Sequence, residues 1–162
     1  MGIYAKILQD SITGIYRTNA ANKILQFINR IRNESDVNQA RRFLIELMQN
    51  ARDLAYKKPD GTPEPVSIRI RLSDTELEFS HNGKVFSVKD ILSIIYQVSS
   101  KKPGEGIGQF GTGFMSTYQL SERVELTSYL KNDDNPYLPF TVCLDRSGLN
   151  KEEILDAIER AM

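Results

Sequence analysis

The two residue types that most often build covalent cross-links and metal sites are nearly absent from this 162-residue sequence. A single cysteine, Cys143, excludes an internal disulfide framework and a cysteine-based structural zinc site. A single histidine, His81, excludes a two-histidine metal motif and leaves one candidate for histidine-based catalysis. Because Cys143 alternates with Val142 and Leu144 in an apolar stretch, we expect a buried structural thiol rather than a nucleophile.

An excess of one charge and a long apolar run are also missing. Twenty-one Lys and Arg residues balance 21 Asp and Glu residues, which argues against a domain held to nucleic acid mainly by phosphate neutralisation. No apolar run approaches the ~20 residues that span a bilayer, and residues 1–10 lack the pattern of a signal peptide. We therefore expect a cytoplasmic protein with neither a membrane partner nor direct nucleic-acid binding.

Helical and strand patterns are both present along the chain, whose length fits one domain. Helices lying outside a sheet of several strands predict an α+β fold, a two-layer α/β sandwich. The sequence stops inside the last predicted helix, so we expect a fragment of a larger protein. The predicted helices are 20–31, 37–57, 87–98 and 151–162, and the predicted strands are 66–72, 77–79, 124–130 and 140–144.

The segment 99–113 is polar and holds five of the ten glycines. Glycines let backbone N–H groups approach an anion closely, and the helical start at Phe114 adds unpaired N–H donors. This pattern favours a phosphate cradle, with a flexible surface loop as the alternative. The spacing also satisfies the dinucleotide fingerprint, but no strand directly precedes it, and P-loop and kinase motifs are absent. The glycines are Gly104, Gly106, Gly108, Gly111 and Gly113, and Lys101 and Lys102 precede them.

A polar stripe follows one face of the strongest predicted helix. Glu46, Asn50, Asp53 and Lys57 lie at i, i+4, i+7 and i+11, and a solvated face is the plain interpretation. The chemistry also suits a nucleotide, because an Asn oxygen can ligate Mg²⁺ that phosphates already hold. A carboxylate one turn away can orient or deprotonate a water for attack on a γ-phosphate.

These segments together resemble the GHKL ATPase superfamily, which includes gyrase B, the ATP-dependent heat-shock chaperones, histidine kinases and the mismatch-repair MutL proteins. The heat-shock chaperone and sacsin-like branch is the most similar. Residues 46–53, Glu-Leu-Met-Gln-Asn-Ala-Arg-Asp, resemble its N-box, and 107–116, Ile-Gly-Gln-Phe-Gly-Thr-Gly-Phe-Met-Ser, resemble its second glycine box. Residues 80–86 occupy the place of the first glycine box, and the resemblance covers roughly residues 40–130.

The resemblance implies a Bergerat-fold ATP site, with helices over a mixed, mostly antiparallel sheet. Glu46 would be the general base that activates water, and Asn50 would coordinate Mg²⁺ together with the phosphates. Asp53 would lie near the ribose or adenine, and residues from about Ser93 to Gly106 would form a mobile lid. The other implied nucleotide-binding residues are His81, Asn82, Gly83, Lys101, Lys102, Gly106, Gly108, Gln109, Phe110, Gly111, Thr112, Gly113 and Phe114. For Lys101 and Lys102, a purely solubilising role is equally compatible with the sequence.

The first glycine box departs from the family at two positions. The adenine-reading Asp is replaced by His81, and the second glycine is replaced by Val85. A neutral imidazole can accept a hydrogen bond from the adenine amino group through its unprotonated nitrogen. We therefore expect adenine affinity to weaken as the pH falls through the histidine range near ~6.5. The alternative is that His81 turns away and Asn82 or water reads the base.

Together, these observations predict an ATP-binding domain that hydrolyses ATP slowly with Mg²⁺. It would act as a nucleotide switch in a larger, chaperone-like or remodelling protein, with downstream domains as partners and a homodimer as one possible assembly. The alternative is a non-catalytic nucleotide-binding or scaffolding module with a degraded first glycine box. A histidine-kinase core is disfavoured because no histidine precedes the N-box. A family Thr near adenine has no certain counterpart, although Thr141 lies on a predicted strand.

Overall fold

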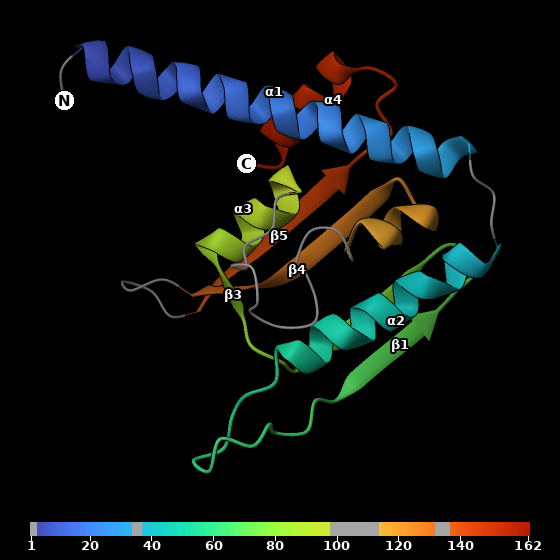
Figure 1. The fold of residues 1–162 in the computed structure, drawn as a ribbon. Coiled ribbons are helices and arrows are strands. Elements are labelled where there is room, and N and C mark those ends of the chain that lie inside the picture. Colours follow the sequence, from blue (N-terminus) through green and yellow to red (C-terminus); the bar gives the residue numbers. More distant parts are fainter. Residues whose placement is uncertain (1–2, 34–36, 98–113, 132–136) are drawn as a thin grey trace.

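The computed structural model describes residues 3–33, 37–97, 114–131 and 137–162. Helices and strands mix along the chain, which confirms the predicted α+β fold. Figure 1 shows α1, α3 and α4 on one side of the β3–β5 strands, and α2 beside β1. In chain order the elements are α1 (Ile3–Asn33), α2 (Val37–Asp53), β1 (Ile68–Leu72), β2 (Leu77–His81), β3 (Phe86–Ser87), α3 (Val88–Tyr96), the 3₁₀ helix η1 (Phe114–Gln119), β4 (Arg123–Lys131), β5 (Leu138–Asp145) and α4 (Lys151–Arg160).

The strands of the described residues form two sheets. In the larger sheet, of order β3-β4-β5, β3 pairs parallel with β4, and β4 pairs antiparallel with β5. β1 and β2 form a separate antiparallel hairpin, in which Ile68 lies opposite His81 and Leu72 lies opposite Leu77. The mixed, mostly antiparallel pairing that the resemblance implies is therefore observed, although it is divided between two sheets.

The main core lies between the larger sheet and its helical cover. β4 alternates, so that Val124 and Leu126 face the core while Arg123 and Glu125 are exposed. Apolar stripes of α1, α3 and α4 meet this inner face together with η1, which removes a large apolar area from water. The buried residues of this core are Ala20, Ala21, Ile24, Ile28, Ile94, Ile95, Tyr96, Met115, Tyr118, Leu144, Ile154 and Ile158.

Two of the predicted helix starts are capped as the sequence indicates. Ser87 forms a capping box with Asp90, whose Oδ2 accepts from the Ser87 backbone N at 2.9 Å. The Asn150 side chain accepts from the backbone N of Glu153 at 2.9 Å and begins α4. Local side-chain chemistry therefore sets where α3 and α4 begin.

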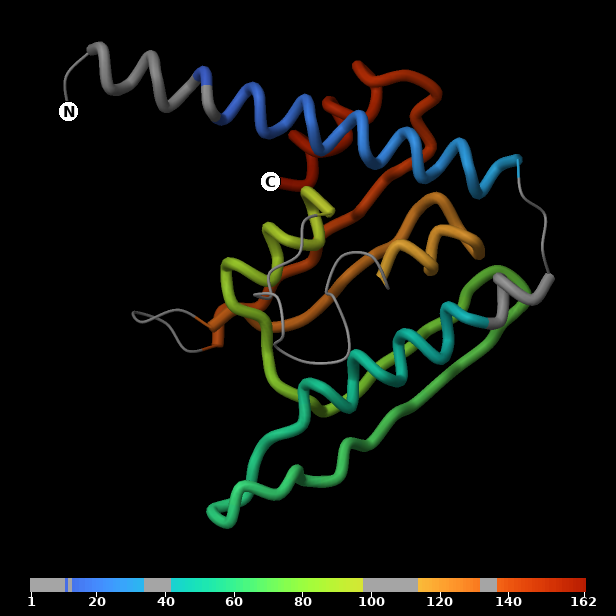
Figure 2. Tube along the Cα trace, viewed as in Figure 1, coloured from blue at the N-terminus to red at the C-terminus, as the bar shows by residue number. Residues whose placement is uncertain are grey.

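α1 crosses the top of the molecule and passes over α4 (Figure 2). Arg17 of α1 lies 3.3 Å from the Glu159 carboxylate of α4, and Arg32 donates to Glu122 at 2.8 Å. The Tyr16 ring, which is partly exposed, meets the buried Tyr96 ring edge-on at 5.5 Å. In the described part of the chain, no helix combines the length and the apolar character that crossing a bilayer requires.

Several details of the predicted elements are wrong. The first helix, expected over 20–31, spans Ile3–Asn33. α2 ends at Asp53, so Lys57 does not extend its polar stripe. Lys57 instead forms an isolated antiparallel β-bridge with Pro63. β1 begins at Ile68, and its apolar face is not half-buried throughout, because Leu72 is 79% exposed.

Cys143 is exposed, which contradicts the expectation of a buried thiol. It lies on β5 between the half-buried Val142 and the buried Leu144, so its side chain points to the opposite, outer face of the sheet. Thr141 shares this face, where its hydroxyl lies 2.9 Å from the hydroxyl of Thr127.

Candidate nucleotide site

The polar face of α2 carries two half-buried side chains that have no partner among the described residues. Glu46 and Asn50 lie one helical turn apart. No hydrogen bond or ion pair engages either side chain within the part of the chain that the structure describes. Half-buried polar groups normally find partners, so an unpaired carboxylate and amide on one helix face are suited to hold a ligand.

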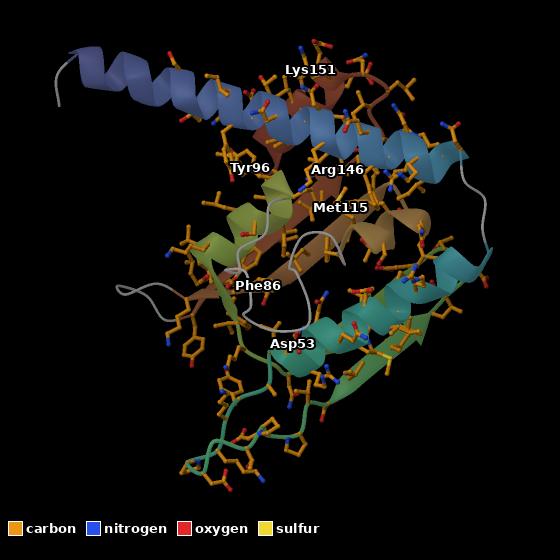
Figure 3. The ribbon with its side chains drawn as sticks, viewed as in Figure 1. Asp53, Phe86, Tyr96, Met115, Arg146 and Lys151 are labelled. Atoms are coloured by element: carbon orange, nitrogen blue, oxygen red, sulfur yellow. The ribbon has the colours of Figure 1, made fainter. Side chains whose placement is uncertain are left out.

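Asp53 ends α2 on the same side of the molecule as the β2–β3 connection (Figure 3). Its Oδ1 lies 3.9 Å from Nη2 of Arg52. Asp53 lies seven positions after Glu46, a distance of about 10 Å along the axis at the α-helical rise. Glu46 and Asp53 therefore lie at opposite ends of the polar face.

The segment after β2 packs directly on the Asp53 end of α2. The backbone N of Lys84 donates to the Leu54 carbonyl at 2.8 Å. A Cβ added at Gly83 would lie 3.0 Å from Leu54 Cβ and 3.1 Å from the Leu54 carbonyl oxygen. Only a glycine allows this approach, so Gly83 joins the first-box segment to the N-box helix.

The imidazole of His81 is tied to the same turn. Its Nδ1 accepts a hydrogen bond from the backbone N of Gly83 at 3.1 Å, and the Phe79 ring lies edge-on at 6.2 Å. Burial lowers the pKa of His81 below its usual value of 6.5, so the ring is neutral at pH 7. The unprotonated nitrogen that we expected to accept from adenine is therefore already engaged within the protein.

Asn82 is engaged as well. Its Oδ1 accepts from the backbone N of Ser67 at 2.8 Å, and its own backbone N donates to the Ser67 carbonyl at 3.3 Å. These bonds hold the chain just before β1 against the end of β2. The side-chain amide oxygen of Asn82 thus helps to join the two strands of the hairpin.

η1 follows the glycine-rich segment and contacts α2, α1 and β4. Phe114 begins it, and the expected helical start is a 3₁₀ helix whose Met115 and Tyr118 are buried. The Thr117 hydroxyl donates to the Phe114 carbonyl at 2.6 Å. The predicted site residues outside the described part of the chain are Lys101, Lys102, Gly106, Gly108, Gln109, Phe110, Gly111, Thr112 and Gly113.

The predicted lid cannot begin at Ser93. Ser93 is buried inside α3, and its hydroxyl donates to the Lys89 carbonyl at 2.7 Å. Tyr96, at the end of α3, is also buried in the core. The part of the predicted lid that the structure describes is therefore a helix packed against the core.

Arg146, whose burial was not predicted from the sequence, is the largest fully buried side chain among the described residues. Its Nη2 donates to the Ile95 carbonyl at 2.7 Å, and its guanidinium lies 6.0 Å from the centre of the Tyr118 ring. Lys23 donates to the Gln97 carbonyl at 2.9 Å, so two cations meet carbonyls at the C-terminal end of α3. The sequence signal is a lone arginine between an apolar strand and a capped helix.

A magnesium ion at Asn50 would need oxygen ligands from a bound phosphate. Among the described residues, no three His, Cys, Asp or Glu side chains come together as a metal site. One amide oxygen fits a cation that keeps several waters and phosphate ligands, as Mg²⁺ commonly does. The donor set on α2 therefore fits Mg²⁺ brought in with a nucleotide, and does not fit a metal held by protein alone.

Two curated proteins show distant similarity to this chain. It is 24% identical over 121 residues to the chaperone protein HtpG of Sulfurovum sp. (strain NBC37-1), covering 59% of this chain and 20% of that protein. It is 26% identical over 147 residues to the chaperone protein HtpG of Campylobacter jejuni subsp. doylei (strain ATCC BAA-1458 / RM4099 / 269.97), covering 82% and 22%. The chain thus spans about a fifth of the length of these relatives. No family model and no solved structure matches it.

Proposed function

We propose that this chain is an ATP-binding domain of GHKL type that hydrolyses ATP slowly with Mg²⁺. The proposal is carried by Glu46 and Asn50 on α2, which have no partner in the described part of the chain, with η1 and the Gly83 turn both packed on that helix. The three segments that resemble the family's boxes are separated in sequence, and described parts of all three meet at α2. The distant similarity to HtpG chaperones supports the same class.

The polar face of α2 suggests how the nucleotide lies. Asn50 would hold Mg²⁺ together with the phosphates. When bound, Mg²⁺ would neutralise phosphate charge that otherwise opposes attack by water. Glu46, one turn away, would orient or deprotonate the attacking water. Asp53 and the His81 turn, about 10 Å further along the helix, would face the ribose and base. The residues at 101–113 would complete the phosphate contacts.

The relatives' names suggest the wider role. The switch would act within a larger chaperone-like protein, coupled to downstream domains, with a homodimer as one assembly and the cytoplasm as its setting. Nucleotide-driven closure commonly converts hydrolysis into such coupling. The rival proposal, a non-catalytic nucleotide-binding module, draws on Val85 in place of the second glycine of the first box.

The test is phosphate release by wild type and by Glu46→Gln in the presence of Mg²⁺ and ATP. A general base is worth about 100-fold or more, so Glu46→Gln should lose at least this much turnover while it still binds nucleotide. Glu125→Gln, on the exposed face of β4, is the matched control and should keep full turnover.

The two candidate functions separate cleanly in the same experiment. Tight binding without turnover by the wild type would favour the non-catalytic module. Equal turnover by wild type and Glu46→Gln would remove Glu46 as the base. An absence of nucleotide binding would reject both functions.

A further inference from the structure

The hydrogen bond at His81 determines what this side chain can offer a ligand. A neutral imidazole has one N–H donor and one acceptor nitrogen. Because a backbone N–H can only donate, the bond from Gly83 to Nδ1 places the ring proton on Nε2. Nε2 has no hydrogen-bond partner among the residues that the structure describes. His81 therefore presents a donor, and no acceptor, to anything bound beside it.

The ring is not free to reverse this polarity. Turning it over would exchange Nδ1 for a carbon and leave the Gly83 N–H without its partner, which costs the desolvation of that group. A Cβ placed on Gly83 would lie only 3.0 Å from Nδ1, which shows how closely the ring sits against the turn. The Phe79 ring borders the imidazole at 6.2 Å. The donor is thus fixed by its surroundings.

The neighbouring Asn82 side chain is already engaged in the hairpin. The Asn82 oxygen already accepts from the backbone N of Ser67 at 2.8 Å. Both of these candidate acceptors thus already take one internal hydrogen bond, whereas the Nε2 donor of His81 has no partner among the described residues.

Purine bases differ in the polarity of the group at position 6. Adenine carries an amino group there, which donates, whereas guanine and hypoxanthine carry an oxygen, which accepts. We propose that His81 makes this a site for 6-oxopurine nucleoside triphosphates, which it binds more tightly than ATP. This inference rests on the proposed function, because it needs the base to lie at the Asp53 end of α2.

Calorimetry with Mg²⁺ and four ligands tests the proposal: ATP, ITP, GTP and inorganic tripolyphosphate. ITP is the matched partner of ATP because it carries the 6-oxo group without the 2-amino group of GTP. A gained hydrogen bond in place of two opposed donors should make ITP bind about 5- to 10-fold more tightly than ATP. GTP should equal ITP where the 2-amino group is tolerated, so ITP against ATP is the deciding comparison.

His81→Asp is the variant that inverts the site, because a carboxylate only accepts. It should reverse the preference, so that ATP binds about 10-fold more tightly than ITP. Thr75→Asp adds the same charge at the exposed far end of the hairpin and should keep the wild-type preference for ITP. Circular dichroism spectra that match the wild type show that each variant is folded.

The outcomes separate this inference from the proposed function. ATP binding as tightly as ITP, or tighter, overturns the inference and leaves nucleotide binding intact. Tripolyphosphate binding as tightly as both nucleotides overturns base recognition while it supports the phosphate site. Failure of all four ligands to bind overturns the inference together with the function on which it rests.

Discussion

The molecule has two halves, which differ in how many large apolar side chains they bury. The packed half, made of α1, α3, α4 and β3–β5, buries its apolar residues in a shared core. The site half, made of α2, β1 and β2, buries Phe43 and Ala51 but leaves exposed the apolar side chains Ile45, Met48, Ile70 and Leu72. Its half-buried Glu46 and Asn50 have no partner in the part of the chain that the structure describes. This difference separates the part that holds the fold from the part suited to bind.

The strongest way to test this comparison is to shorten the same residue type in each half. Leu144→Ala removes a side chain with 0% exposure and should lower the free energy of unfolding by about 2–5 kcal/mol. Leu72→Ala, on a strand of the site half with 79% exposure, should change it by less than about 0.5 kcal/mol. Urea unfolding followed by circular dichroism measures both, and similar losses would show that the halves are not distinct.

Glycine substitutions give the next largest contrast. Gly83→Ala pushes a methyl group against Leu54 and His81, each 3.0 Å away, and should cost about 1–3 kcal/mol. Gly14→Ala lies on the exposed face of α1 with nothing within 4 Å, and should stabilise by about 0.5–1 kcal/mol. Opposite shifts in melting temperature are expected. A neutral Gly83→Ala would show that α2 and the turn are not in close contact.

Much of the packed half could be predicted from sequence because its signals are local. Capping residues mark the starts of α3 and α4, and period-two alternation marks β4. The prediction that Cys143 is buried was wrong, because successive residues of a strand point to opposite faces. Val142 and Leu144 face the core, so Cys143 between them faces outward. Arg146 could not be predicted as buried, because its partners come from α3 and η1.

The site half was predictable only in outline. The order of the boxes suggested that α2 and the first-box segment lie close, and the Lys84–Leu54 bond shows that they do. The engagement of His81 and Asn82 depends on single hydrogen bonds across a turn, which no periodicity records. The roles of Glu46, Asn50 and Asp53 toward a nucleotide stay predictions until binding is measured.

Titration of single groups in each half should give smaller effects, beginning with Asp145 at the end of β5 in the packed half. Burial alone would raise its pKa, but bonds from the Ser147 hydroxyl and backbone and from Arg123 lower it to about 2. The unfolded carboxyl binds protons first, so this stability is present above about pH 4 and is lost as the pH falls toward 2. After allowance for solvent screening, Asp145→Asn should remove roughly 1–2 kcal/mol at neutral pH, measured by urea unfolding. Asp156→Asn, at an exposed position on α4, should remove almost nothing.

His81 provides the smallest and most specific effect, because it is the sole histidine in the sequence. Burial lowers its pKa in the folded state, so the unfolded chain takes up the proton first and the free energy of unfolding falls as the pH drops below 6.5. His81→Gln should flatten this dependence between pH 8 and 5, because it removes the sole histidine, the side chain whose ordinary pKa lies in this range. The α-amino group and the carboxyls are unchanged in the variant. The single histidine ring signal in a proton NMR titration reports the folded pKa directly. A folded-state pKa at or above 6.5 would contradict the buried ring and the Gly83 bond. It would indicate that the His81 side chain is exposed to solvent.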